Sequence, residues 1–114
     1  MITLWHNPRC SKSRQALALL QDAGAEVSLR KYLEDAPSLA ELHAVRLALG
    51  TPPALQMVRT GEKLFKELGL SKTSADTALL AAMAAHPILI ERPIAFNGQK
   101  AIIGRPPENV RALL

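Results

Sequence analysis

The spacing of apolar residues changes several times along the chain, and each change marks an element. Residues 2–5 are typical of a short strand, which the turn-forming pair Asn7-Pro8 ends. From residue 10 or 11 onward the apolar positions recur at helical spacing, and Gly24 supplies the stop. Residues 27–31 alternate apolar with polar, which predicts a second strand parallel to the first in a right-handed βαβ unit.

The middle of the chain is predicted to be helical. The pattern favours four segments, over residues 39–49, 54–58, 62–68 and 76–85. Ser38 and Glu41 have the spacing of a capping box at the start of the first segment, which Gly50 ends. Ser74 is expected to cap the last segment.

Strand signals return near the C-terminus. Residues 94–96 and 101–103 flank Asn97-Gly98, the strongest short hairpin signal, so these strands are expected to pair antiparallel. Pro106-Pro107 begins a final helix. The element order is β-α-β, a helical insertion and β-β-α. This order predicts an α/β, thioredoxin-like fold with a mixed four-stranded sheet, in a single domain over residues 1–114.

The composition is that of a folded protein with a mostly aliphatic core. Hydrophobic residues make up 48% of the chain and charged residues 21%, far from the composition of a disordered segment. Aromatic residues are only 4%, so no aromatic platform for stacking nucleic-acid bases is expected. The formal charge of +4 is spread without a basic block, which favours a small anion over nucleic acid as the partner.

Cys10 is the only cysteine, and this count excludes several classes of site. One thiol forms no intramolecular disulfide and no multi-cysteine zinc or iron–sulfur site, so we expect no bound metal and a reducing, cytoplasmic setting. The N-terminal residues lack the charged and apolar regions of a signal peptide. The longest apolar run, residues 78–85, is cut short by His86-Pro87, so no membrane span is predicted.

Cys10 is predicted to lie at the junction of the first strand and the first helix, where a reactive thiol is favoured. The free amides and partial positive charge of a helix N-terminus stabilise a thiolate, and Arg9, Lys12 and Arg14 add positive charge. Residues 10–13 form a C-x-x-S sequence, a dithiol redox motif with a hydroxyl in place of the second thiol. The alternative is a buried free cysteine that acts as a small hydrophobic residue.

Four further residues are candidates to act with Cys10. His6, at the end of the first strand, could hold the thiolate through a charged hydrogen bond, or it could be a strand-end histidine bound to the backbone. The non-helical parts of the second half contain three arginines, Arg59, Arg92 and Arg105. A guanidinium suits a tetrahedral oxyanion because its planar fork donates two parallel hydrogen bonds. Taken singly, each arginine would instead be a solvated surface residue.

Five motifs form a specific combination that is spread over nearly the whole chain. They lie at residues 6–14, 32–34, 59, 86–94 and 104–108. They include a His-Asn-Pro-x-Cys start, an Arg-Pro pair and a closing Arg-Pro-Pro-Glu. Together they closely resemble the glutaredoxin-coupled, thioredoxin-fold arsenate reductases. The chain departs from the best-known members at Arg9, where they have a small residue, and at Ser11-Lys12, where they have Gly-Thr.

The resemblance implies a role for each site residue. Cys10 would be the nucleophile, and His6 would help to depress its pKa. The oxyanion would be held by Arg59, Arg92 and Arg105. Supporting positions would be taken by Asn7, Ser13, Arg14 and Pro93, the last as a cis-proline that faces the site.

The expected reaction is the reduction of arsenate, and an electron count requires a partner thiol. Reducing arsenate to arsenite takes two electrons and therefore two thiols, whereas this chain has one. Glutathione would supply the second thiol as a co-substrate. Glutaredoxin would then reduce the Cys10-glutathione disulfide, with no bound cofactor. The expected partners are thus arsenate or a related oxyanion, glutathione and glutaredoxin.

Two alternative functions stay open. A glutathione-dependent thiol transferase would use the same arginines to bind glutathione carboxylates in place of arsenate. A non-catalytic regulator that binds RNA polymerase would carry a C-x-x-C switch at this position, and Ser13 removes the second thiol of such a switch.

Overall fold

A four-stranded sheet forms the centre of one half of the molecule. The computed structural model describes residues 1–114, and its strands are β1 (Ile2–Trp5), β2 (Val27–Arg30), β3 (Ile94–Phe96) and β4 (Ala101–Ile103). Their order in the sheet is β2-β1-β3-β4. β1 runs parallel to β2, and β3 runs antiparallel to both β1 and β4. The mixed four-stranded sheet and the β-α-β start confirm the predicted α/β class.

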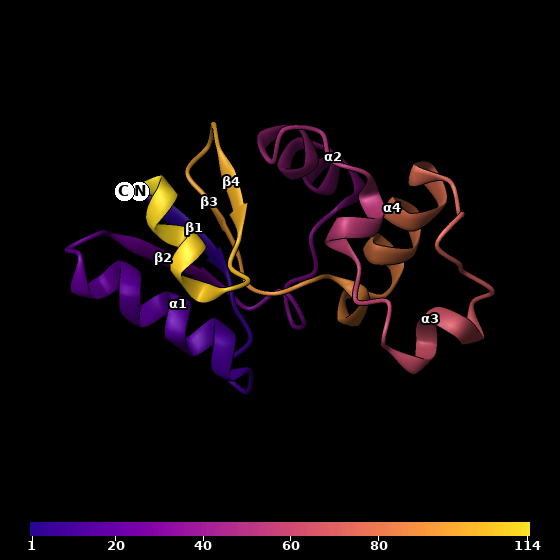
Figure 1. The fold of residues 1–114 in the computed structure, drawn as a ribbon, viewed down its shortest axis with the longest axis horizontal. Helices are drawn as coiled ribbons and strands as arrows, with labels where there is room; N and C mark the ends of the chain where they lie inside the picture. The colour runs from indigo at the N-terminus through magenta and orange to yellow at the C-terminus, as the bar shows by residue number, and fades with distance from the viewer.

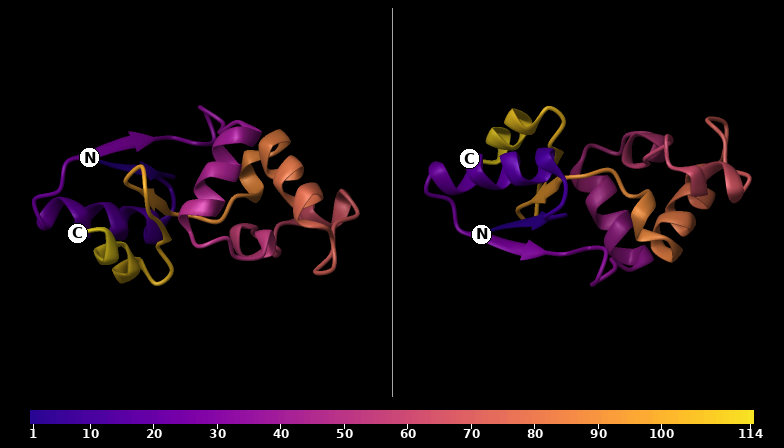
Figure 2. Two further views of the ribbon diagram at one scale, coloured as in Figure 1. Left: turned by 90° about the horizontal axis from the view of Figure 1, so that it is seen from above. Right: turned by 90° about the horizontal axis from the view of Figure 1, so that it is seen from below.

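Two helices cover one face of this sheet (Figures 1 and 2). They are α1 (Ser11–Asp22) and η3 (Pro107–Leu113), which lie against each other. η3 is the final helix predicted from Pro106-Pro107, and it is wound as a 3₁₀-helix. The core on this face is formed by six buried side chains, Ile2, Leu4, Ala16, Leu20, Ala95 and Val110.

The helical insertion forms the other half of the molecule, on the right of Figure 1. It consists of α2 (Leu39–Ala48), η1 (Ala54–Met57), α3 (Lys63–Glu67), α4 (Asp76–Ala85) and η2 (Pro87–Leu89), where η1 and η2 are 3₁₀-helices. Adjacent residues of a strand point to opposite faces, so Leu4 and Ala95 pack on the α1 side whereas Trp5 and Ile94 join the core of the insertion. Each face of the sheet therefore contributes to a hydrophobic core.

Of the two predicted helix caps, one is confirmed and one is wrong. Glu41 N–H donates to Ser38 Oγ at 3.1 Å and Ser38 N–H donates to Glu41 Oε1 at 3.0 Å, which completes the capping box. Ser74 does not cap α4. Ala75 precedes that helix without a side-chain cap, and Ser74 Oγ accepts the N–H of Ser71 within a turn. A serine hydroxyl can bond a local backbone amide in a turn as readily as at a cap.

The β3–β4 hairpin forms as predicted, but its turn is shifted by one residue. Asn97 N–H donates to the Lys100 carbonyl oxygen at 3.0 Å, so the central pair is Gly98-Gln99 rather than Asn97-Gly98. Gly98 has φ +96°, a conformation that a side chain disfavours. Asn97 Oδ1 accepts the N–H groups of both Gln99 and Lys100, so its role is to stabilise the turn from the preceding position.

The strand register brings the sequence motifs to one edge of the sheet. Trp5 is paired with Arg30 and with Ile94, and Ile94 is paired with Ile103. The segments next to these four residues therefore meet at that edge. They are residues 6–10, 31–34, 91–93 and 104–106. None of the helices combines the length and the apolar composition that a membrane span requires.

Candidate functional site

Cys10 lies at the N-terminus of α1, beside the free amides of the first helical turn. It is the N-cap residue, with φ −93° and ψ 122°, and only 8% of it is exposed. Its N–H donates to the Asn7 carbonyl oxygen at 3.0 Å, and Asn7 Oδ1 accepts the N–H of Arg9 at 3.0 Å. Arg14 Nη1 donates to the Pro8 carbonyl oxygen at 2.9 Å. These bonds hold the loop that carries the thiol.

Opposing effects act on the Cys10 thiol, and those that favour the thiolate prevail. Burial raises its pKa. The backbone N–H groups of Ser13 and Lys12 and the positive charge of Arg92 lower it, and the resulting pKa lies below the ordinary value for cysteine. Arg105 Nη2 also lies 3.9 Å from Cys10 Sγ. The thiolate form of Cys10 is thus favoured at this position.

His6 does not make the charged hydrogen bond to Cys10 that the sequence suggests. It is buried, and its Nδ1 lies 2.6 Å from Ser13 Oγ, which also accepts the N–H of Asn7 at 3.0 Å. Ser13 Oγ therefore joins the His6 ring to the backbone of Asn7. Burial and two nearby cations lower the pKa of His6, in agreement with a neutral ring. The structure links His6 to Cys10 only through Ser13.

Arg59, Arg92 and Arg105 come from three separate segments and line one cavity of about 350 Å³. Glu62 and Glu91 line it as well, and we call it the arginine cavity. Arg105 connects this cavity to the thiol through its contact with Cys10 Sγ. The structure contains no group of three or more His, Cys, Asp or Glu side chains that could hold a metal ion.

Two of the three arginines already have carboxylate partners. Arg59 Nη1 lies 2.8 Å from Glu62 Oε1, and Arg105 Nε lies 3.0 Å from Glu91 Oε1. Arg92 differs, because its Nε is buried and has no hydrogen-bond partner. Three guanidinium groups against two carboxylates leave the cavity with net positive charge. Arg92 is therefore the arginine of the cavity whose guanidinium has no carboxylate partner.

Pro93 lies at the closest approach of the segments that carry Arg92 and Arg105. The Arg92-Pro93 bond is cis, as expected from the sequence, and the Arg105-Pro106 bond is also cis. Gly104 N–H donates to the Pro93 carbonyl oxygen at 2.8 Å, and a Cβ at position 104 would lie 2.7 Å from Pro93 Cγ. Gly104 is therefore required for this packing, a role that the motif alone did not reveal.

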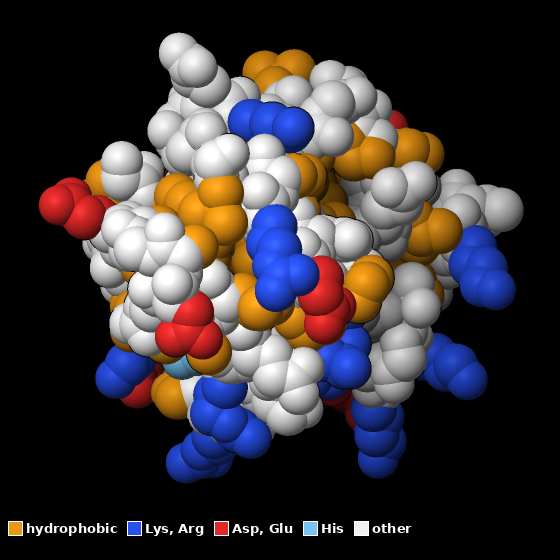
Figure 3. All heavy atoms as spheres, turned by 60° about the vertical axis from the view of Figure 1, so that its left-hand side comes forward, with side chains coloured by type: hydrophobic (Ala, Val, Ile, Leu, Met, Phe, Trp, Pro, Cys, Tyr) orange, Lys and Arg blue, Asp and Glu red, His pale blue; other side chains and the backbone are white.

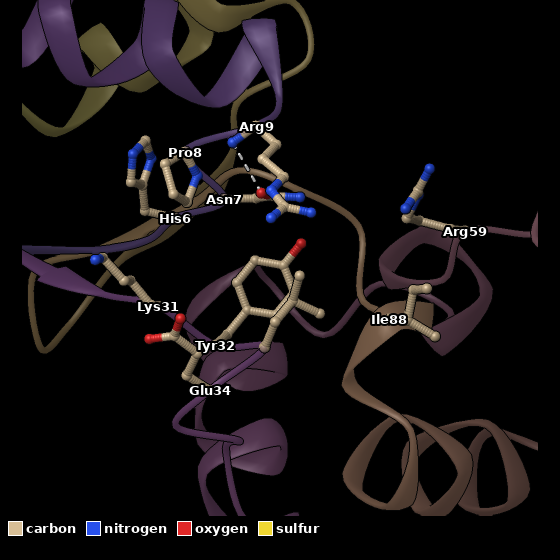
Figure 4. A pocket seen from close by; sticks show the side chains of 10 residues that line it. His6, Asn7, Pro8, Arg9, Lys31, Tyr32, Glu34, Arg59 and Ile88 are labelled. Carbon is tan, nitrogen blue, oxygen red and sulfur yellow. Dashed lines mark hydrogen bonds between the residues drawn. The ribbon is translucent and has the colours of Figure 1, made fainter.

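Tyr32 belongs to the site although the sequence analysis did not single it out. Its side chain is buried, and burial raises its pKa against the positive charges of Arg92 and Arg59. The Cys10 charge acts on it as well. In Figure 4 its hydroxyl points toward Arg9. Its position could have indicated this, since Tyr32 lies just beyond the carboxyl end of β2. The carboxyl ends of the neighbouring parallel strands β1 and β2 meet at one edge of the sheet.

A second cavity, of about 430 Å³, lies beside the loop that precedes Cys10 (Figure 4). We call it the outer groove; it is lined by residues 6–9, residues 31–34, Arg59 and Ile88. Arg59 lines both this groove and the arginine cavity, so the two are neighbours. On the face shown in Figure 3, Lys and Arg side chains gather along the lower edge, the side on which α1 lies in Figure 1.

Comparison with known proteins relates almost the whole chain to one family. A model of the ArsC family matches residues 5–113. A protein of Neisseria meningitidis serogroup B named arsenate reductase is 48% identical over 114 residues, which cover 99% of this chain and 97% of the relative. A Haemophilus influenzae protein, also named arsenate reductase, is 44% identical over 114 residues, which cover 99% of this chain and 98% of the relative.

A solved structure shows the same fold. The structure described as arsenate reductase from Vibrio cholerae matches with a TM-score of 0.92 and 49% identity, over 99% of this chain and 97% of that one. This match confirms the thioredoxin-like α/β fold that the element order predicts.

Proposed function

The chain belongs to the ArsC family, and from this membership we propose that it is an arsenate reductase with Cys10 as its nucleophile. The observation that carries the proposal is the convergence of three arginines beside a cysteine whose thiolate is favoured. Arsenate is a tetrahedral oxyanion, and the planar fork of a guanidinium suits its oxygens. Arg92 lines the cavity without a carboxylate partner, so its charge is left for such an anion.

In the first step the Cys10 thiolate attacks the arsenic of arsenate held in the arginine cavity. An S–As bond forms, and one As–O bond breaks as that oxygen leaves in water. Arg92 and Arg105 neutralise the charge on the remaining oxygens from the side nearest Cys10, and Arg59 does so from the wall shared with the outer groove. Arsenic remains As(V) at this stage.

In the second step a glutathione thiolate attacks the sulfur of Cys10. An S–S bond forms and the S–As bond breaks, and the electron pair of that bond stays on arsenic, which leaves as arsenite, As(III). Each sulfur loses one electron, so two thiols reduce one arsenate to arsenite and one water is released. Because Cys10 is the only cysteine of the chain, the second thiol comes from outside the protein.

Regeneration requires a further thiol partner. Glutaredoxin attacks the glutathione sulfur of the Cys10-glutathione disulfide and releases the Cys10 thiolate. The cycle is balanced by thiols alone, so glutathione is a co-substrate and no resident metal or organic cofactor is part of it. A cytoplasmic glutathione pool supplies these electrons.

The remaining residues of the motif position the loop. Ser13 Oγ accepts the backbone N–H of Asn7 and bonds the His6 ring, so these contacts hold the start of α1 against the loop before Cys10. Arg14 fastens the loop by its bond to the Pro8 carbonyl oxygen. Pro93, packed on Gly104, places Arg92 beside the thiol.

A coupled assay tests the proposal. Oxidation of NADPH is followed with glutathione reductase, glutaredoxin and glutathione, with and without arsenate. We expect arsenate-dependent oxidation with the wild type and none above background with Cys10→Ser, while Arg111→Ser, changed at an exposed position on η3, keeps the wild-type rate.

Two other outcomes would replace the proposal. Turnover of a small glutathione mixed disulfide, with no response to arsenate, would identify a thiol transferase. Absence of both activities, together with recovery of RNA polymerase in a pull-down, would identify a non-catalytic regulator.

A further inference from the structure

The outer groove contains charged side chains that the reduction of arsenate does not use. Arg9, Lys31 and Glu34 line it, and none of the three has an ion-pair partner in the structure. Arg59, the other charged residue of the groove, is already paired with Glu62. Free charges grouped around a hollow are available to a ligand.

These charges are arranged around an apolar floor. In Figure 4, Lys31 and Glu34 lie on one side of the Tyr32 ring and Arg9 lies on the other. Leu33 and Ile88 line the same groove, and both are large hydrophobic residues that are exposed to solvent. Its volume of about 430 Å³ lies within the range of about 300–1,000 Å³ that is typical of small-molecule sites.

We propose that the outer groove is the binding site for glutathione as the second thiol, separate from the arginine cavity that holds the oxyanion. Arg9 binds the glycine carboxylate of glutathione, and Lys31 and Glu34 bind the carboxylate and the ammonium of its γ-glutamyl end. Along the groove a cation comes first, then the apolar surface around Tyr32, and then a cation together with an anion. Glutathione has a matching order, with one carboxylate at its glycine end and a carboxylate together with an ammonium at its γ-glutamyl end. This assignment rests on the proposed arsenate reductase cycle.

The geometry of displacement at sulfur requires two pockets. The incoming thiolate approaches Cys10 Sγ from the side opposite to the departing arsenic, so the thiol and the oxyanion need separate positions around that atom. Arg105, in the arginine cavity, contacts Sγ directly. The outer groove is lined by the loop 6–9, which leads into Cys10, and by Tyr32, on which the Cys10 charge acts. A thiol bound there lies beside the loop that carries the sulfur, in a cavity separate from the one that holds the oxyanion.

Oxidised glutathione tests the groove without arsenate. The Cys10 thiolate attacks one sulfur of this disulfide, forms the Cys10-glutathione disulfide and releases one glutathione thiolate. The rate is measured by mass spectrometry and compared with that of a neutral disulfide, bis(2-hydroxyethyl) disulfide. The neutral reagent reports any change in the reactivity of Cys10 itself.

Loss of a cation is expected to slow only the charged reagent. Arg9→Ser and Lys31→Ser should each reduce the rate with oxidised glutathione about tenfold relative to the neutral disulfide, as a charge-assisted hydrogen bond is lost. The matched controls Arg111→Ser and Lys72→Ser, at exposed positions outside both cavities, should stay within about twofold of the wild type. Equal slowing with both disulfides, or none, would overturn the assignment.

Glu34→Gln separates specific binding from general attraction. If Glu34 binds the ammonium group of glutathione, Glu34→Gln slows the reaction of Cys10 with oxidised glutathione about fivefold. If the groove only attracts anions, removal of a negative charge makes that reaction faster. A faster reaction would therefore contradict the binding mode.

The coupled assay then distinguishes failure of this inference from failure of the proposed function. Arg9→Ser and Lys31→Ser should raise KM for glutathione about tenfold and leave KM for arsenate within about twofold. A rise in KM for glutaredoxin alone would show that the groove docks the protein and not glutathione. If the wild type does not reduce arsenate at all, the proposed function fails while the disulfide rates still decide what the groove binds.

Discussion

Arg30 and Arg92 are both partly buried arginines, yet one is saturated with partners and the other is not. Arg30 forms two hydrogen bonds with Glu41, and it also donates to Asp35 Oδ1 and to the carbonyl oxygens of Asp35 and Ala36. These contacts tie the end of β2 to the start of α2. Every donor nitrogen of this guanidinium is used within the protein.

Arg92 has the opposite arrangement. Its Nε is buried and has no hydrogen-bond partner, and its charge acts on Cys10. A saturated guanidinium stabilises the fold because its desolvation is compensated in the folded state, whereas an unsaturated one lowers stability until a ligand binds. Arg30 thus serves the structure, and Arg92 is the arginine to which the proposed function assigns an anion.

The largest expected effect is on activity and separates the two arginines most clearly. Arg92→Ala should lower kcat/KM for arsenate about 100-fold, because a preorganised donor to the oxyanion is lost. The free energy of unfolding, measured in urea, should not fall, since no internal bond of Nε is lost and an unsatisfied buried donor is removed. A wild-type rate, or a large loss of stability without a loss of activity, would reverse the roles assigned here.

Arg30→Ala should have the reverse effects. Its hydrogen bonds to Glu41, Asp35 and Ala36 are lost together, so the free energy of unfolding should fall by about 2 kcal/mol. Urea unfolding monitored by fluorescence measures this, because Trp5 is the only tryptophan and is buried in the folded state. kcat/KM should stay within about threefold of the wild type, and a 100-fold loss would show that Arg30 also serves the site.

Lysine at each position sharpens the comparison. Arg92→Lys should retain about a tenth of the wild-type kcat/KM, since a point charge keeps the attraction to arsenate but loses the fork. Arg30→Lys should lose about 1 kcal/mol of unfolding free energy, because one ammonium does not reach all the acceptors of Arg30. Full rescue by lysine at position 92 would mean that the fork is not used.

The titration of Cys10 should respond to only one of the two arginines. The positive charge of Arg92 lowers the pKa of Cys10, so Arg92→Ala should raise that pKa. Arg30→Ala should leave it unchanged, because Arg30 is not among the groups that act on the thiol. The ultraviolet absorbance of the thiolate as a function of pH measures both values. Equal shifts in the two variants would remove Arg92 from its special place beside the sulfur.

The smallest expected effect concerns the carboxylate partner of Arg30. The hydrogen bond from Arg30, with that from Ser38, lowers the pKa of Glu41 to about 2, below its ordinary 4.5. The folded state thus binds fewer protons than the unfolded state between these values, so Glu41 stabilises the fold fully above pH 4.5 and loses this effect as pH falls toward 2. Since its side chain is 44% exposed, we expect a contribution of only about 1 kcal/mol.

Glu41→Gln measures this contribution. Urea midpoints of the wild type and the variant should differ at pH 7 and converge as the pH is lowered from 4.5 to 2. A difference that stays constant over this range would mean that the charge of Glu41 contributes nothing.

Elements whose signals lie within a few residues were predictable. Short-range patterns predicted the capping box at Ser38 and Glu41 and the start of α1 after Cys10. They also predicted the strand–helix–strand order that pairs residues 2–5 in parallel with 27–31. Even here local signals left room for error, since Ser74 bonds Ser71 instead of capping α4. A hydroxyl has several backbone amides within reach, and packing selects among them.

The roles of individual polar side chains were harder to predict. His6 was expected beside Cys10, but its nitrogen bonds Ser13, seven residues away and one helical turn into α1. Gly104 and Tyr32 were not singled out, because their importance comes from contact with Pro93 and from a cavity assembled from distant segments.

The sequence by itself determined the element order, the single thiol at a helix N-terminus and, for the proposed reaction, the need for an outside thiol, because periodicity, capping and an electron count depend only on residue types and short spacings. Only the tertiary structure decided which arginines meet and which remain unpaired. Arg59 pairs with Glu62 and Arg105 with Glu91, while Arg92 Nε has no partner. The physical reason is that charge pairing acts over a few ångströms of space, and the packing of the helical insertion against the sheet sets those distances.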